Sequence, residues 1–307
     1  MKNITFPKGV WPVMLTPFTE DNTIDFRSLE KLVEWYIANG SAGLFATCQS
    51  SEIFFLSTEE KVAVAEYVVK AAAGRVPVIA SGNTADSLDE QIDQMSRIAS
   101  TGVDALIFLS NRFAKEDESD ETWIANARYV IDRLPQDIPL GFYECPYPYK
   151  RILSKPILEF CRELDRFYFL KDTSCDIENI REKIRILEGT HMGLYNANTA
   201  TLLESLQAGS HGYSGVMANM QCDLYSWLLN NWEKEAERAR TLSDFLTVSA
   251  FIERQVYPVN AKYYLKKESV IGTIVTRTKD HNLLGPTERS EVEQLSRLSE
   301  IVRKSCF

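Results

Sequence analysis

A lysine at the end of an apolar run is the first residue in the chain to suggest chemistry. Lys171 follows the run FYFL at residues 167–170, which is apolar on both sides of a pleated strand. Burial disfavours the charged ammonium, and a partly neutral amine can attack a ketone to form an imine. A protonated imine then withdraws electrons from the neighbouring carbon. The alternative is a structural lysine that pairs with Asp172 or Glu144.

A tyrosine ends the apolar run that precedes the one carrying Lys171. Tyr143 closes the sequence GFY at residues 141–143, and a barrel of parallel strands would place it next to the strand of Lys171. A phenol there can carry a proton to and from an imine carbon, a hydroxyl or a leaving group. The alternative is a core tyrosine whose hydroxyl reaches the rim.

A short polar segment, CQSSE at residues 48–52, follows the second apolar run. Small polar residues in such a loop can present backbone N–H groups to a carboxylate, and Ser50 and Ser51 add hydroxyl donors. An ordinary capped loop is the alternative.

Other kinds of catalytic site find little support. The three histidines are far apart and no HExxH motif occurs, so we expect no metal and no cofactor. Glu52, Glu144 and Asp172 offer carboxylates for Mg²⁺, but helix caps and ion pairs explain them more simply. A G-x-S-x-G motif, as serine hydrolases of the α/β class carry, is missing.

Composition narrows the class of protein further. The net charge of −9 over 307 residues, without a basic stripe, argues against nucleic-acid binding. No signal peptide or transmembrane run is visible, so we expect a cytoplasmic protein that does not bind a membrane. The six cysteines form no CxxC pair, which predicts reduced thiols; Cys48 and Cys145 can line a pocket, but we propose neither as a nucleophile.

The elements that must position these residues alternate regularly. Short, continuously apolar runs are typical of parallel strands buried on both faces. Amphipathic segments between them are typical of helices, with Asp25 as an N-cap and Ser57 with Glu60 as a capping box. We predict strands at 10–15, 43–47, 76–80, 105–109, 140–144, 167–171, 193–196 and 212–216. We predict helices at 26–39, from 57, and at 86–100, 121–134, 156–163, 177–187, 199–208 and 222–232.

Eight strand–helix repeats predict an α/β fold, a closed (β/α)8 TIM barrel over residues 1–232. Three further helices, at 234–250, 255–267 and 287–304, form a C-terminal helical extension (233–307) of the same structural domain. An open doubly wound sheet is less favoured, because the first strand lacks a glycine-rich turn. Barrel enzymes react at the C-terminal ends of their strands, where Thr16, Asn196 and Ser214 also lie.

The chain resembles the dihydrodipicolinate synthase / N-acetylneuraminate lyase family of pyruvate-dependent barrel enzymes. The resemblance covers most of the chain, and its motifs are strong only together. They are GVWPVMLTPF at 9–18, CQSSE at 48–52, LSTEE at 56–60, VPVIASG at 76–82, YECP at 143–146, LKDT at 170–173 and GSHGYSGVMAN at 209–219.

The resemblance implies a metal-independent Schiff-base mechanism. Lys171 would carry the pyruvate imine and Tyr143 would shuttle the proton. Gln49 and Ser50 match the hydroxyl pair of the family's loop, whose backbone binds the keto-acid carboxylate, and Ser214 matches a position whose backbone lies beside the imine. A homo-oligomer, a dimer or tetramer, is also implied.

Three departures from the family pattern bear on the second substrate. The loop has lost its two glycines and its first threonine, so Gln49 cannot serve as a hydroxyl relay. A tyrosine pair of the synthase is absent from residues 108–113, and Pro148 lies near the position of its substrate-binding arginine, with Arg151 a few residues late. Tyr147 and Tyr149 are expected to make the site more aromatic.

We therefore predict a lyase or aldolase that joins pyruvate, or a related 2-keto acid, to an aldehyde or cleaves such a product. Three alternatives stay open. The first is a dehydratase of a 2-keto-3-deoxy sugar acid, the second is a true 4-hydroxy-tetrahydrodipicolinate synthase, and the third is a non-catalytic keto-acid sensor.

Overall fold

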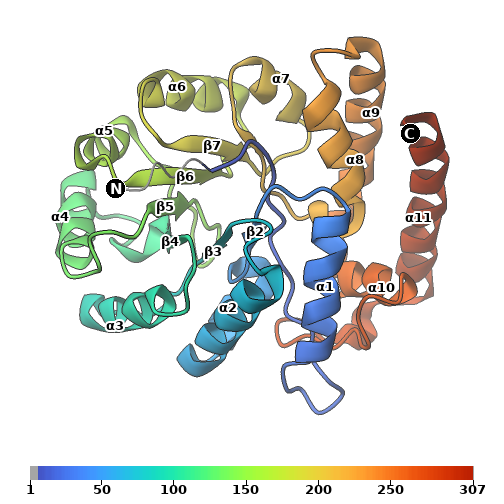
Figure 1. The fold of residues 1–307 in the computed structure, drawn as a ribbon, viewed down its shortest axis with the longest axis horizontal. Helices are drawn as coiled ribbons and strands as arrows, with labels where there is room; N and C mark the ends of the chain where they lie inside the picture. Colours follow the sequence, from blue (N-terminus) through green and yellow to red (C-terminus); the bar gives the residue numbers. More distant parts are fainter. Residues whose placement is uncertain (1–5, 307) are drawn as a thin grey trace.

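The computed structural model describes residues 6–306 as a (β/α)8 barrel with a helical extension at its C-terminal end (Figure 1). Its strands are short and buried, as the continuous apolar runs predicted. They are β1 (Gly9–Val10), β2 (Leu44–Phe45), β3 (Val78–Ala80), β4 (Ala105–Leu109), β5 (Leu140–Tyr143), β6 (Phe167–Asp172), β7 (Gly193–Asn196) and β8 (Gly212–Tyr213).

All neighbouring strands are parallel, in the order β1-β8-β7-β6-β5-β4-β3-β2. Two isolated bridges, Val10 with Ser41 and Val13 with Phe45, join the ends of this sheet and close the barrel. The predicted first strand, 10–15, is therefore much shorter than expected. Pro12 explains the interruption because it has no N–H to donate to a ladder.

The barrel helices pack around the strands (Figure 1). Both predicted caps are confirmed: Asp25 accepts a hydrogen bond from the Ser28 N–H, and Ser57 and Glu60 form a capping box. The helices are α1 (Phe26–Ala38), α2 (Thr58–Ala72), α3 (Leu88–Ala99), α4 (Asp120–Ile131), α5 (Lys155–Leu164), α6 (Ile177–Leu187), α7 (Leu202–Gln207) and α8 (Ala218–Asn231).

Aromatic side chains fill the interior of the barrel below the C-terminal ends of its strands. The ring of Trp11 lies 5.2 Å from that of Phe169 and 5.7 Å from that of Tyr195, measured between centroids. Phe169 and Tyr195 stack at 4.2 Å. A packed core of this kind leaves room for a ligand only towards the C-terminal ends of the strands.

The extension contains α9 (Ala236–Ser249), α10 (Val259–Lys267) and α11 (Pro286–Cys306), with a 3₁₀ turn, η4 (Ala250–Arg254), after α9. These helices lie on the side of the barrel formed by α8 and α1 (Figure 1). The predicted helix 255–267 begins four residues later than expected, and the residues before it turn towards the barrel. None of the helices within residues 6–306 is both long and apolar enough to cross a membrane.

Candidate active site

A cavity of about 470 Å³ lies at the C-terminal ends of β5 and β6. Four of the seven residues that the sequence suggests as catalytic or substrate-binding line it: Gln49, Ser50, Tyr143 and Lys171. Tyr143 and Lys171 are paired in register on the neighbouring strands β5 and β6, so both side chains point to the same side of the sheet.

Lys171 is a buried amine, with only 3% of its surface exposed. Its Nζ lies 4.2 Å from the centroid of the Tyr143 ring. Burial lowers the pKa of Lys171 to about 8, because an ammonium loses its hydration inside the protein. The alternative of a structural lysine paired with Asp172 or Glu144 does not hold, since both carboxylates bind a different lysine, Lys183.

The Tyr143 hydroxyl donates a hydrogen bond to Gln49 Oε1 at 3.2 Å, and the Cys145 thiol donates to the same oxygen at 3.5 Å. Burial raises the pKa of Tyr143 well above its ordinary value, so the phenol keeps its proton at neutral pH. Gln49 thus orients Tyr143, a contact that the sequence did not predict for it.

The Ser51 side chain holds the loop at residues 48–52. Its Oγ accepts from the Cys48 N–H at 3.0 Å and lies 2.7 Å from the Met14 carbonyl oxygen. Cys48 is extended (φ −152°), so the family's glycine is not needed there, and Glu52 takes the left-handed conformation (φ 63°). Thr16 was expected to contact substrate, but it is fully buried and donates to the Ser51 carbonyl at 2.8 Å.

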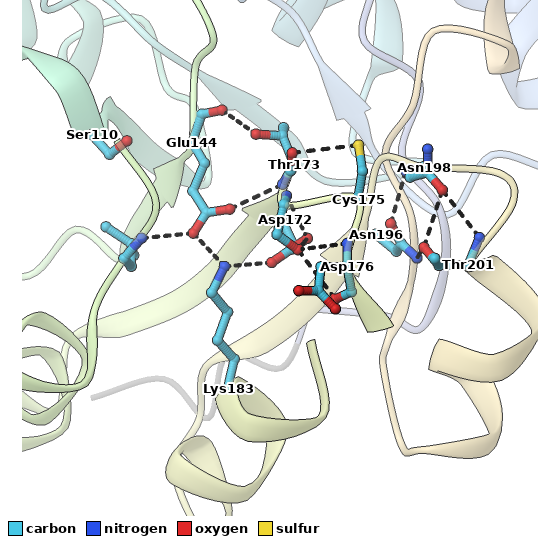
Figure 2. A network of polar contacts seen from close by, with 12 residues as sticks. Ser110, Glu144, Asp172, Thr173, Cys175, Asp176, Lys183, Asn196, Asn198 and Thr201 are labelled. Atoms are coloured by element: carbon cyan, nitrogen blue, oxygen red, sulfur yellow. Dashed lines mark hydrogen bonds and ion pairs between the residues drawn. The ribbon is translucent and has the colours of Figure 1, made fainter. Parts of the chain in front are cut away.

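Asn196 and Ser214 are likewise not in the cavity lining. Asn196 donates to the Thr201 hydroxyl at 2.9 Å and accepts from the Asn198 N–H (Figure 2). It also donates to the Ser205 hydroxyl at 3.1 Å. Internal hydrogen bonds therefore use the polar groups of its amide, which corrects its assignment as a substrate-binding residue.

The Ser214 hydroxyl donates to the Trp11 carbonyl at 3.0 Å, on the buried side of its strand end. The next residue, Gly215, lines the cavity together with Ala197. The side chain of Ser214 is thus not the binding group.

A buried ion cluster fixes the strand ends that carry Tyr143 and Lys171. Lys183 of α6 contacts the carboxylates of Glu144 and Asp172, and all three side chains are buried (Figure 2). Glu144 also accepts the N–H groups of Leu153 and Thr173, at 2.8 and 3.0 Å. Burial raises the pKa of Glu144 while Lys183 opposes that shift.

Sequence reasoning missed Lys183, although a signal was present. Ile180, Lys183 and Leu187 lie three and four residues apart and form the buried stripe of α6. A lysine in such a stripe needs a buried partner, and two carboxylates at nearby strand ends were available.

The extension supplies the far side of the cavity, with Glu253 and Tyr257 among the lining residues. The Tyr257 hydroxyl donates to Ser50 Oγ at 2.8 Å. Glu52, which directly follows the loop, forms a fully buried ion pair with Lys262 of α10 at 2.8 Å. Glu52, Glu144 and Asp172 therefore do not come together as a Mg²⁺ site. No periodic signal in the sequence pointed to Glu253 or Tyr257.

Comparison with known proteins places these observations in a family. Residues 6–298 match the profile described as the dihydrodipicolinate synthetase family. A 4-hydroxy-tetrahydrodipicolinate synthase of Pseudoalteromonas atlantica is 28% identical over 307 residues, 97% of this chain and 98% of that protein. The same-named protein of Shewanella piezotolerans is 30% identical over 207 residues, 67% of this chain and 69% of the relative.

Solved structures share the fold. The dihydrodipicolinate synthase of Acinetobacter baumannii, solved with pyruvate, superposes with a TM-score of 0.84 at 24% identity, covering 97% of this chain and 100% of that one. The synthase of Methylacidiphilum fumariolicum gives a TM-score of 0.85 at 18% identity, over 97% and 98% of the two chains.

Proposed function

The chain belongs to the dihydrodipicolinate synthetase family of Schiff-base lyases, and we propose that Lys171 is the amine that binds the keto acid. One observation carries this proposal. Lys171 is a buried lysine without an ion-pair partner among residues 6–306, and it opens into a cavity beside a protonated phenol. Its depressed pKa of about 8 leaves roughly a tenth of the amine neutral at pH 7.

The proposed reaction begins when neutral Lys171 attacks the carbonyl carbon of pyruvate and water leaves, which forms a protonated imine. Loss of a proton from the methyl carbon gives an enamine, and its carbon attacks an aldehyde. Tyr143 delivers a proton to the aldehyde oxygen as the new carbon–carbon bond forms. Water then hydrolyses the imine and releases the product. The reverse sequence cleaves the same bond.

The loop at residues 49–50 is the proposed site for the keto-acid carboxylate. Gln49 and Ser50 both line the cavity and begin a 3₁₀ turn, η1 (Gln49–Ser51), whose first N–H groups have no partner within the turn. Ser50 accepts the Tyr257 hydroxyl, so its own hydroxyl hydrogen is available to a carboxylate oxygen. An aldehyde partner, a homo-oligomer and a cytoplasmic location stay predictions.

Borohydride trapping tests the imine directly. With pyruvate and borohydride, we expect a covalent adduct on Lys171, located by peptide mass spectrometry, and no adduct in Lys171→Ala. Lys266→Ala, which changes an exposed lysine of α10, is the matched control and should label fully. An adduct on another lysine, or none with any 2-keto acid, would show that the assignment is wrong. Labelling without turnover of any aldehyde would favour a sensor.

A further inference from the structure

The cavity beyond Lys171 has an aromatic and apolar surface. Phe54, Phe55 and Tyr147 line it, and the rings of Phe54 and Tyr147 meet edge to face with centroids 4.9 Å apart. Phe55 and Tyr147 are about half exposed, at 49% and 51%. Tyr149 was expected to join them, but its hydroxyl turns away to the Asn111 carbonyl at 2.8 Å. Exposed aromatic surface inside a cavity favours an apolar ligand.

Among residues 6–306, no arginine lines this cavity to bind a second carboxylate. Pro148 lies near the position of the synthase's arginine. Arg151, the nearest candidate in sequence, binds Asp120 at 2.8 Å and the carbonyls of Lys115 and Glu118 at 3.0 Å each. Lys171 aside, the cation among the lining residues is Lys279, which is exposed and attracts anions weakly through solvent.

Glu253 adds a carboxylate to the lining; burial raises its pKa, while the nearby charges of Arg254 and Lys171 oppose that shift and favour the anion. Its carboxylate comes from η4 and makes no hydrogen bond to any of residues 6–306, so it is free to act on a ligand. The other lining carboxylate, Glu52, forms an ion pair with Lys262 and accepts a hydrogen bond from the Thr278 N–H. An anionic group that enters near Glu253 meets a like charge in a partly desolvated site, which is unfavourable.

We propose that the aldehyde partner of this enzyme carries an uncharged aromatic body that packs against Phe54 and Tyr147, and that Glu253 selects against aldehydes with a carboxylate. This inference rests on the proposed function of Lys171. In the synthetic direction, the enamine carbon of bound pyruvate bonds to the carbon of the aldehyde, whose oxygen takes a proton. Hydrolysis then gives a 4-aryl-4-hydroxy-2-oxobutanoate, with no change in oxidation state overall.

Two aldehydes that differ in one charged group provide the test. With the full-length protein and pyruvate, kcat/KM for benzaldehyde should exceed that for 4-carboxybenzaldehyde by about tenfold or more. Glu253→Gln should reduce this ratio severalfold by raising the value for the carboxylated aldehyde. Glu237→Gln, at the first turn of α9, is the matched control and should leave the ratio unchanged.

Variants of the aromatic surface test the packing. Phe54→Ala or Tyr147→Ala should lower kcat/KM for benzaldehyde by about tenfold, mainly through KM, while borohydride trapping of pyruvate stays within twofold. Phe251→Ala removes an aromatic ring that is 55% exposed outside the cavity lining and should change neither value.

The outcomes separate this inference from the one on which it rests. If pyruvate is trapped on Lys171 but the carboxylated aldehyde reacts faster, or no aromatic aldehyde reacts, the aromatic substrate class is wrong and the imine chemistry stands. A preference for the carboxylate that disappears in Lys279→Gln would assign the rim ammonium as its receptor, which also overturns the inference. If no pyruvate is trapped on Lys171, both the proposed imine chemistry and the aromatic substrate class are wrong.

Discussion

At the scale of single residues, the protonation of Lys171 should decide the rate of the proposed first step. Its pKa of about 8 lies below the ordinary 10.5 because burial disfavours the ammonium. Since the neutral amine is the nucleophile, we expect the initial rate of pyruvate trapping to rise about tenfold from pH 7 to pH 9 and then level off. Rapid-quench trapping over that range measures it. A rate that still climbs at pH 10 would mean an amine with an ordinary pKa.

We propose that Tyr143 acts beside Lys171, at a later step of the reaction. Tyr143→Phe keeps the ring beside Lys171 and removes the proton donor, so we expect trapping to persist while turnover falls by about two to four powers of ten. Tyr195→Phe is a matched control, because that hydroxyl donates to the Pro7 carbonyl at 3.1 Å and does not line the cavity. Equal turnover in wild type and Tyr143→Phe would remove the phenol from the mechanism.

The sequence predicted correctly that Lys171 and Tyr143 lie side by side, and it predicted their surroundings poorly; their catalytic roles stay predictions. Lys171 and Tyr143 end apolar strands, a position that can be read from the chain alone. Thr16, Asn196 and Ser214 were also expected at strand ends, yet their polar groups bind neighbouring parts of the chain, and strand position does not show which way a hydroxyl or amide turns. Glu253 had no signal, since its place depends on how the extension docks.

At the scale of elements, α6 holds the ends of β5 and β6 through one side chain. Lys183→Met would leave Glu144 and Asp172 buried together without their cation, so we expect a loss of about 3–5 kcal/mol in the free energy of unfolding. Urea denaturation measures this loss, and turnover should fall with it as Tyr143 and Lys171 lose their support.

A second substitution makes the same prediction specific. Glu144→Gln, added to Lys183→Met, removes one of the two unpaired charges and should restore part of the lost stability. If the double variant is less stable than Lys183→Met alone, repulsion between the two carboxylates is not the cause.

Apolar runs and amphipathic stripes in the sequence predicted nearly every strand and helix. They did not predict the residues at which these elements begin and end. β1, β2 and β8 are two residues long where five or six were predicted. A strand is defined by its ladder hydrogen bonds, but residues beyond the ladder can be buried too. An apolar run therefore overestimates strand length wherever a proline or a turn breaks the ladder.

At the scale of the whole molecule, the extension lines one side of the cavity, and the buried pair of Glu52 and Lys262 joins it to the barrel. Lys262→Met should destabilise the protein by about 3–5 kcal/mol, because Glu52 stays buried without its cation. Lys171→Met should instead stabilise it at pH 7, since no ion pair among residues 6–306 is lost and the cost of burying an ammonium, the largest effect on the Lys171 pKa, disappears. Urea denaturation of both variants measures these two changes in the free energy of unfolding, which should have opposite signs.

The pH dependence of the gain in Lys171→Met follows from linkage. Between pH 8 and 10.5 the unfolded chain binds a proton at Lys171 that the native protein does not, so wild-type stability rises with pH. The advantage of Lys171→Met should therefore shrink across this interval. If the difference in unfolding free energy between Lys171→Met and the wild type is constant from pH 7 to 10, the added stability comes from packing and not from the lost charge.

The way the barrel closes has a consequence for its motions. Only isolated bridges join residues 10–14 to residues 41–45 in the described part of the chain. Here the Met14 N–H donates to the Phe45 carbonyl at 3.0 Å, and the Phe45 N–H donates to the Pro12 carbonyl at 3.1 Å. In deuterated water these two amides should exchange before those of β5 and β6, because the barrel should open first between residues 10–14 and 41–45. The loop that is proposed to receive the keto-acid carboxylate begins three residues after Phe45, so pyruvate bound there should slow that exchange. Unchanged exchange with saturating pyruvate would mean that closure and ligand binding are independent.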